Sequence, residues 1–83
     1  MSWDEDVVAP VEKLLEEWQR EGNHAAVEVV LPAWRTNSGL TDGWAAAAAA
    51  LRDGLASGAV SRAADRRTLE RVARRIERAV RRR

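Results

Sequence analysis

The sequence predicts an all-α protein, a compact bundle of three to four helices. Three observations predict this fold class. Apolar residues recur every three or four positions over most of the 83 residues, which is the period of an amphipathic helix. Residues 45–50 are six consecutive Ala, the residue with the highest helix propensity. No two segments have the pattern of strands that could pair with each other. We expect a single helical domain over residues 1–83.

The first helix is predicted over residues 4–21. Ser2, followed three residues later by Glu5, fits a capping box, and acidic residues crowd the first turn, where the helix dipole favours them. Pro10 predicts either a kink or a regular helix that starts near it, and Gly22 ends the helix. The apolar positions with helical spacing are Val7, Val11, Leu14 and Trp18. This segment is therefore predicted to be amphipathic.

The second helix is predicted over residues 23–35, with Asn23 as its N-cap. It is apolar nearly all round, and Glu28 is its only acidic residue, so the pattern predicts a buried helix. The Val-rich run at 27–31 also fits a short strand, but the chain offers no second strand to pair with it. Pro32 predicts a kink or an early end.

A loop over residues 36–43 precedes a third helix, which is predicted to end at Ser57 with Gly58 directly after it. Thr41 or Asp42 is expected to cap the start of this helix. Because the helix contains the run of six Ala, a neighbouring backbone can come close to it.

The fourth helix is predicted from about residue 61 to residue 83, and it is rich in Arg. Its apolar stripe consists of Leu69, Val72, Ile76, Ala79 and Val80. Apolar positions near a chain terminus fray unless something packs on them. We therefore expect a long neighbouring helix to cover this stripe. The acidic first helix is the best candidate, either from this chain or from a second copy.

The net charge of +1 conceals a strong division along the chain. Residues 1–42 carry nine acidic and three basic residues, which gives −6, and residues 43–83 carry four acidic and eleven basic residues, which gives +7. This asymmetry has three explanations. The two halves pair within one fold, they pair between two chains, or the basic half binds an acidic partner.

The leading interpretation is a small protein–protein interaction module, either an adaptor or a self-associating subunit of a homo-oligomer, with complementary acidic and basic halves. The predicted partner interface on the fourth helix consists of Leu69, Val72, Ile76 and Val80, flanked by Arg71, Arg74, Arg75 and Arg78. These Arg side chains are expected to face Glu12, Glu16 and Glu17. The alternative is a small nucleic-acid-binding protein, because Arg side chains at helical spacing can follow phosphates.

The loop between the second and third helices is a second candidate site. Its polar residues lie between two aromatic residues, which is a composition that fits a small recognition pocket. The same residue types are also those that turns and caps use, so ordinary turn chemistry remains the alternative. The residues in question are Trp34, Arg35, Asn37, Ser38, Asp42 and Trp44.

Several function classes receive no support from the sequence. The common catalytic and cofactor motifs are absent, and there is no Cys for a disulfide or a thiolate metal site. His24 is the single His, and we interpret it as a partly exposed residue in the first turn of its helix. We expect no enzyme activity, no metal and no cofactor. The acidic start is unlike a signal peptide and no segment fits a membrane span, so we expect a cytoplasmic protein.

The stretch from Leu15 to Ala26 resembles the first helix pair of bacterial effector-associated, death-like adaptor domains. The resemblance implies a helical module that recruits partners through charged surfaces, and we assign no residue role from it. The start of the third helix, Gly43-Trp44-Ala45, is similar to that of a tetratricopeptide repeat. The period of such repeats, however, is absent from this chain.

Overall fold

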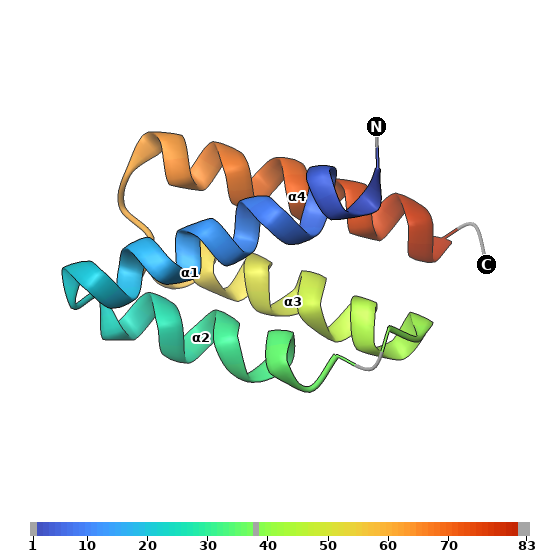
Figure 1. The fold of residues 1–83 in the computed structure, drawn as a ribbon, viewed down its shortest axis with the longest axis horizontal. Coiled ribbons are helices and arrows are strands. Elements are labelled where there is room, and N and C mark those ends of the chain that lie inside the picture. The colour runs from blue at the N-terminus through green and yellow to red at the C-terminus, as the bar shows by residue number, and fades with distance from the viewer. Residues whose placement is uncertain (1, 38, 82–83) are drawn as a thin grey trace.

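The computed structural model describes residues 2–37 and 39–81, and within these residues it contains four α-helices, one π-helical turn and no strand (Figure 1). The prediction of an all-α bundle is confirmed. The elements in chain order are the π-helical turn η1 (Asp4–Val8) and the helices α1 (Ala9–Glu21), α2 (His24–Arg35), α3 (Thr41–Ser57) and α4 (Ala63–Arg81).

Consecutive helices run in opposite directions, and each helix packs against two neighbours (Figure 1). Helix α2 lies between α1 and α3, and α4 closes the bundle by packing on both α3 and α1. The most extensive contact joins α3 and α4. The turn η1, the last turns of α4 and the start of α3 all lie at one end of the bundle. Segments from the two ends of the chain therefore meet there.

Trp18 is the largest side chain in the core, and it is only 1% exposed. Its indole nitrogen donates a hydrogen bond to the Asp65 carboxylate, with 3.3 Å between Nε1 and Oδ2, so the polar atom of this buried ring has a partner. The fully buried aliphatic side chains around it are Val7, Val11, Val30, Leu51, Val60, Leu69, Val72 and Ile76. All four helices contribute to this core, which joins them into one unit.

The expectation that Pro10 sets the start of the regular helix is confirmed, because α1 begins at Ala9 and Pro10 is in its first turn. Proline cannot donate a backbone hydrogen bond, so a proline is tolerated in this position. Before it, the chain forms the π-helical turn η1, in which the backbone N–H of Ala9 donates to the carbonyl of Asp4. The hydroxyl of Ser2 accepts a hydrogen bond from the backbone N–H of Glu5 at 3.2 Å, which is one of the two hydrogen bonds of a capping box.

Asn23 caps α2 as predicted. Its side-chain oxygen accepts a hydrogen bond from the backbone N–H of Ala26 at 3.3 Å, and its side-chain nitrogen donates to the carbonyl of Ala59 at 3.2 Å. The side chain of Asn23 thus caps the first turn of α2 and also binds the segment that connects α3 to α4. Gly22 and Gly58 both have positive φ angles, of 75° and 79°, and end α1 and α3 where expected.

Two local predictions are wrong. Helix α2 is not buried all round, since only Ala26 and Val30 are fully buried on it and Glu28 is exposed. A helix in a four-helix ring turns only one face to the core, so its other apolar residues remain half-exposed. Neither Thr41 nor Asp42 caps α3, because the helix already begins at Thr41 and the residue before it provides no side-chain cap.

Candidate functional site

The apolar stripe of α4 lies inside the bundle. Leu69, Val72 and Ile76 are each 0% exposed, whereas Val80 is half-buried. The chain itself covers the stripe, mainly with α3 and to a lesser extent with α1 and η1. The prediction that Leu69, Val72 and Ile76 form an interface with a second protein is therefore corrected, because the folded monomer leaves no apolar surface on them.

The helix that covers α4 also differs from the expected one. The expectation was α1, but α4 makes its largest contact with α3. The reason is the Ala run of α3, because small side chains such as the buried Ala48 border α4 and allow the two backbones to approach closely. Within residues 2–37 and 39–81, none of the ion pairs joins the Arg residues of α4 to Glu12, Glu16 or Glu17.

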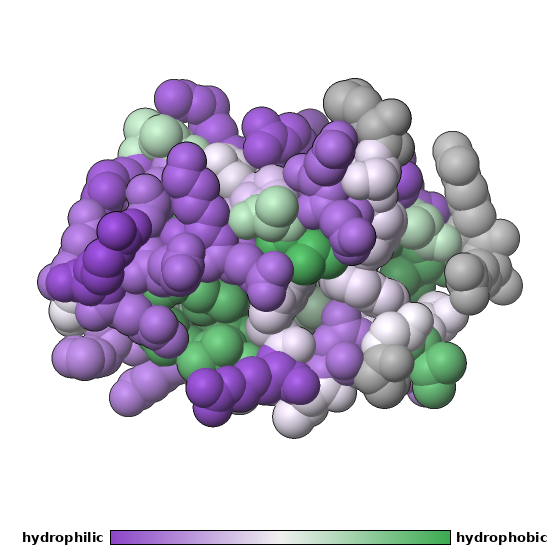
Figure 2. Space-filling model, viewed as in Figure 1, coloured by the Kyte–Doolittle hydropathy of each residue, from purple (hydrophilic) through white to green (hydrophobic). Residues whose placement is uncertain are grey.

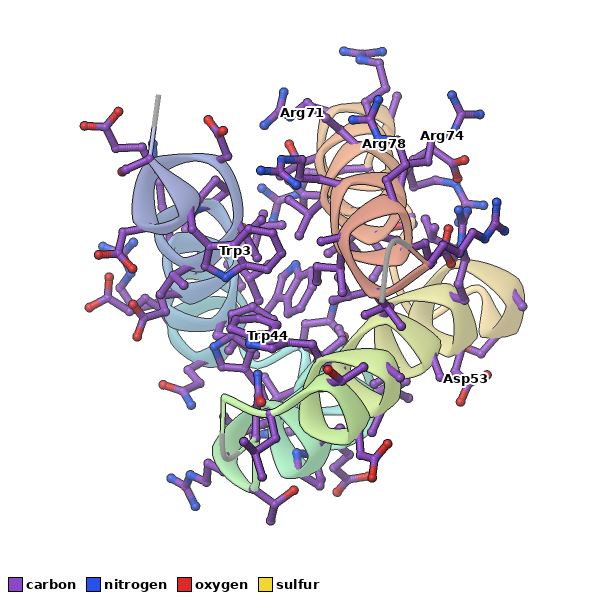
Figure 3. All side chains as sticks on the ribbon, turned by 90° about the vertical axis from the view of Figure 1, so that its right-hand side faces the viewer. Trp3, Trp44, Asp53, Arg71, Arg74 and Arg78 are labelled. Carbon is purple, nitrogen blue, oxygen red and sulfur yellow. The ribbon has the colours of Figure 1, made fainter. Side chains whose placement is uncertain are left out.

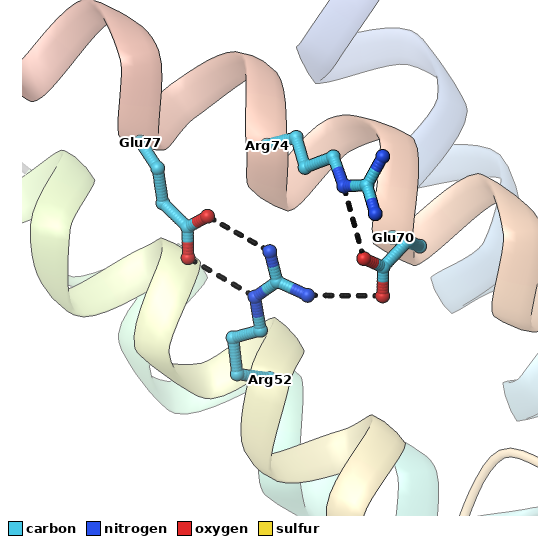
Figure 4. A network of polar contacts seen from close by, with 4 residues as sticks. All are labelled: Arg52, Glu70, Arg74 and Glu77. Atoms are coloured by element: carbon cyan, nitrogen blue, oxygen red, sulfur yellow. Dashed lines mark hydrogen bonds and ion pairs between the residues drawn. The ribbon is translucent and has the colours of Figure 1, made fainter.

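The acidic groups that pair with Arg at the α3–α4 contact come from α4 itself (Figure 4). Arg52 of α3 donates to both carboxylate oxygens of Glu77, at 3.0 and 2.8 Å, and to one oxygen of Glu70 at 2.9 Å. Glu70 also accepts a hydrogen bond from Nε of Arg74 at 3.1 Å. This network joins α3 to α4 at the rim of the core, where all four side chains remain partly exposed to solvent.

The network shifts the pKa values of its members. Hydrogen bonds from Arg52 lower the pKa of the Glu77 carboxyl and that of the Glu70 carboxyl below their ordinary value of 4.5. Hydrogen bonds to Glu77 and then Glu70 raise the pKa of the Arg52 guanidinium. All three groups are therefore charged at neutral pH, and two of the three acidic residues of α4 are occupied in holding α3.

This network predicts a pH-dependent stability. The two carboxyl pKa values are lower in the folded chain than in the unfolded chain, so the network stabilises the fold fully above about pH 4.5 and loses this effect as the pH falls through the folded values. Replacing Arg52 with Met should lower the urea midpoint of unfolding at pH 7, and the difference from the wild type should shrink at about pH 3. Arg67→Met, outside the network, is the control. An equal difference at both pH values would contradict the electrostatic role.

The outer face of α4 carries a stripe of exposed Arg side chains opposite the buried stripe. We call it the Arg stripe, and it consists of Arg67, Arg71, Arg74, Arg78 and Arg81. Its members follow one another about 5 Å apart along the helix axis, so the stripe extends over about 21 Å. Three of them, Arg71, Arg74 and Arg78, point away from the bundle in Figure 3. Arg67, Arg71 and Arg78 take part in none of the ion pairs among the described residues.

A face of opposite charge lies on η1 and α1. From the start of η1 to the end of α1 the chain carries seven acidic and two basic residues, a net charge of −5, whereas α4 carries seven Arg and three acidic residues, a net charge of +4. Figure 3 shows carboxylate oxygens along the outer side of α1, away from α4. We call this surface the acidic face, and its exposed acids are Asp4, Glu12 and Glu16. Glu21 is paired with Arg62, and Glu5 borders the groove between α1 and α4. Lys13 and Arg20 interrupt it.

Apolar surface is scarce on the described part of the molecule. Leu40, at 69%, is the only large apolar side chain there that is fully exposed. The face shown in Figure 2 is mainly hydrophilic, and apolar atoms appear on it only in small separate patches. The other large apolar side chains that reach the surface are half-buried, among them Val27, Val29 and Leu31 of α2.

The loop residues do not converge on one pocket. Asn37 uses its side-chain oxygen to accept a hydrogen bond from the backbone N–H of Gly39 at 2.9 Å, which is turn chemistry. Arg35 and Asp42 are exposed, and Ser38 lies outside the described residues. The rings of Trp34 and Trp44 do come together, edge to face, with centroids 5.7 Å apart.

The structure adds two residues to this aromatic pair that the sequence analysis did not place beside it. Trp3 packs edge to face on Trp44 with ring centroids 5.0 Å apart, and the guanidinium of Arg75 lies 4.9 Å from the centroid of the Trp3 ring. Trp3 is at the start of the chain and Arg75 is near its end, so only the closed bundle brings them together. Arg75 had been assigned to the α4 interface with Arg71, Arg74 and Arg78, but it faces this cluster instead.

Comparison of the chain with models of protein families, with curated proteins and with solved structures found no significant match. None of the helices over residues 2–37 and 39–81 combines the length and the apolar content that crossing a membrane requires.

Proposed function

We propose that this protein is an interaction module that binds a second copy of itself, with the Arg stripe of one copy on the acidic face of the next. The observation that carries the proposal is the separation of opposite charges onto two different outer faces of one molecule. The apolar stripe of α4 is already used within the monomer. Charge therefore remains as the feature that distinguishes these two faces from the rest of the surface.

The two faces belong to different helices, so a contact between them is heterologous. Each contact leaves one Arg stripe and one acidic face free, so further copies can bind. The assembly then either closes into a ring or remains an open chain of molecules. In this proposal the protein has no catalytic role, and His24, which is exposed, is dispensable for binding.

The association should be weak and strongly dependent on salt. Exposed ion pairs contribute only about 0.2–1 kcal/mol each, and contacts of small area are typical of transient complexes. Charges on exposed side chains are screened over about 10 Å at 0.1 M salt and about 3 Å at 1 M. A charged partner that competes for either face should therefore dissociate the assembly readily.

Sedimentation velocity of the wild-type protein tests the proposal. We expect the weight-average mass to exceed that of the monomer in about 20 mM salt and to fall to the monomer in about 500 mM salt. A monomer at both salt concentrations, with the protein at millimolar levels, would refute self-association. An assembly that persists unchanged at high salt would show that charge does not hold it.

The Arg stripe itself favours nucleic acid as the second candidate partner. Five exposed Arg side chains along about 21 Å of helix can contact successive phosphates. Adding a random DNA duplex to the low-salt sample separates the two candidates. Co-sedimentation of the protein with the duplex at the expense of its own assemblies would favour the nucleic-acid function.

A further inference from the structure

A hollow lies at the end of the bundle where η1 meets the last turns of α4. Its volume is about 430 Å³, which is within the range of small-molecule sites in proteins. The residues that line it come from four parts of the chain and are Trp3, Gly39, Thr41, Trp44, Arg75, Ala79 and Val80. Apolar and aromatic groups form about half of the wall, and polar groups form the rest.

Arg75 supplies the charge of this hollow. It is half-buried, unlike the exposed members of the Arg stripe, and its guanidinium lies on the ring of Trp3. Among the described residues it takes part in no ion pair and no side-chain hydrogen bond. Its N–H groups are therefore available to an acceptor that enters the hollow. The hydroxyl of Thr41 is a second polar group of the lining.

The π-helical turn contributes to the same place. Trp3 directly precedes η1, and the rings of Trp3 and Trp44 pack edge to face at this end of the bundle (Figure 3). π-Helical turns are rare and occur frequently at functional sites. Trp3, directly before this turn, lines the hollow beside Arg75 and Trp44.

We propose that this hollow binds a small aromatic carboxylate. The carboxylate would accept hydrogen bonds from Arg75, whose planar guanidinium suits this group, and from the hydroxyl of Thr41. The ring would pack on Trp44 and Val80. An organic cation does not fit the same place, because the guanidinium already occupies the face of Trp3 and would repel it. The site is separate from the Arg stripe, so the inference does not depend on the proposed self-association.

Titration with 3-phenylpropionate, followed by the indole N–H resonances in ¹H–¹⁵N spectra, tests the site. The resonances of Trp3 and Trp44 should shift and saturate below about 10 mM ligand, as expected for a ligand of this size. The resonance of Trp18 should stay in place, because its ring is buried in the core and bonded to Asp65. The uncharged 3-phenylpropionamide is the control for the carboxylate and should bind at least about tenfold more weakly.

Two matched variants test whether Arg75 supplies the positive charge that binds the carboxylate. Arg75→Gln should weaken binding of 3-phenylpropionate by at least about tenfold, whereas Arg78→Gln, on the exposed side of α4, should leave it unchanged. Ala79→Leu, which fills the hollow and keeps Arg75, should also abolish the shifts; it replaces Arg75→Gln if that variant does not fold. Absence of saturable shifts in the wild type, equal binding of the amide, or full binding by both Arg75→Gln and Ala79→Leu would overturn the proposal.

Discussion

Replacing Ile76 with Ser is expected to lower the free energy of unfolding by about 3–5 kcal/mol. Ile76 is 0% exposed, so the change removes buried apolar volume and places a hydroxyl in the core. A domain of this size has a total stability of roughly 4–12 kcal/mol. The variant should therefore be close to unfolding, although the residue is only a few positions from the end of the chain.

The effect of Ile76→Ser should be the same at low and high protein concentration, because the monomer alone buries the side chain. Urea denaturation followed by Trp fluorescence, at two protein concentrations about a hundredfold apart, measures this. Val80→Ser is the matched control on the same helix, and it should cost much less because Val80 is only half-buried. A loss of stability seen only at the higher concentration would place Ile76 in an interface between copies, against this account.

The double substitution Arg71→Gln with Arg78→Gln should weaken self-association by roughly two- to thirtyfold, since each exposed ion pair contributes about 0.2–1 kcal/mol. Both side chains are exposed members of the Arg stripe and have no ion-pair partner among the described residues, so the stability of the monomer should not change. Sedimentation equilibrium in low salt gives the association constant.

A control with the same net charge makes this prediction specific. Lys13→Gln with Arg20→Gln also removes two positive charges, so both double variants have a net charge of +1 − 2 = −1. Lys13 and Arg20 interrupt the acidic face, however, and their removal should strengthen association. Opposite effects at equal net charge support contact between the two faces. If both variants change association in the same direction, the net charge of the molecule governs it and the two faces do not.

The parts of this fold that the sequence predicted correctly are those that depend on neighbouring residues. Asn23 was identified as a cap because its side chain reaches a backbone N–H three residues along the chain. Gly22 and Gly58 were placed at helix ends because these positions require a positive φ angle. The apolar stripe of α4 was also read correctly, since its spacing depends only on the geometry of a helix.

Which helices pack against each other could not be predicted from neighbouring residues in the sequence. The pattern showed that Ile76 would be covered, but the covering helix was assigned by charge, and close packing against the Ala run of α3 decided it instead. The aromatic cluster illustrates the same limit. Trp3 and Arg75 are 72 positions apart, and no local signal indicates that η1 turns Trp3 towards α4.

The surface assigned to a partner changes accordingly. The sequence pointed to both the apolar stripe and the Arg residues of α4. The structure buries Leu69, Val72 and Ile76 completely and leaves the members of the Arg stripe exposed. The binding role of Arg71, Arg74 and Arg78 stays a prediction, while Arg75 is assigned to the aromatic hollow. The sign of the charge on such a surface can be reversed by substitution. Variants with reversed charges therefore test the proposed self-association most directly.

A mixing experiment with charge-reversed variants tests head-to-tail association most directly. One variant carries Arg71→Glu with Arg78→Glu and retains its acidic face, and the other carries Glu12→Arg with Glu16→Arg and retains its Arg stripe. Each variant alone has lost one of the two faces, so each should sediment as a monomer in low salt. Their mixture should form complexes, because the Arg stripe of the second variant is opposite in charge to the acidic face of the first, and the two reversed faces are again opposite in charge. Association of either variant alone, or a mixture that stays monomeric, would contradict the account.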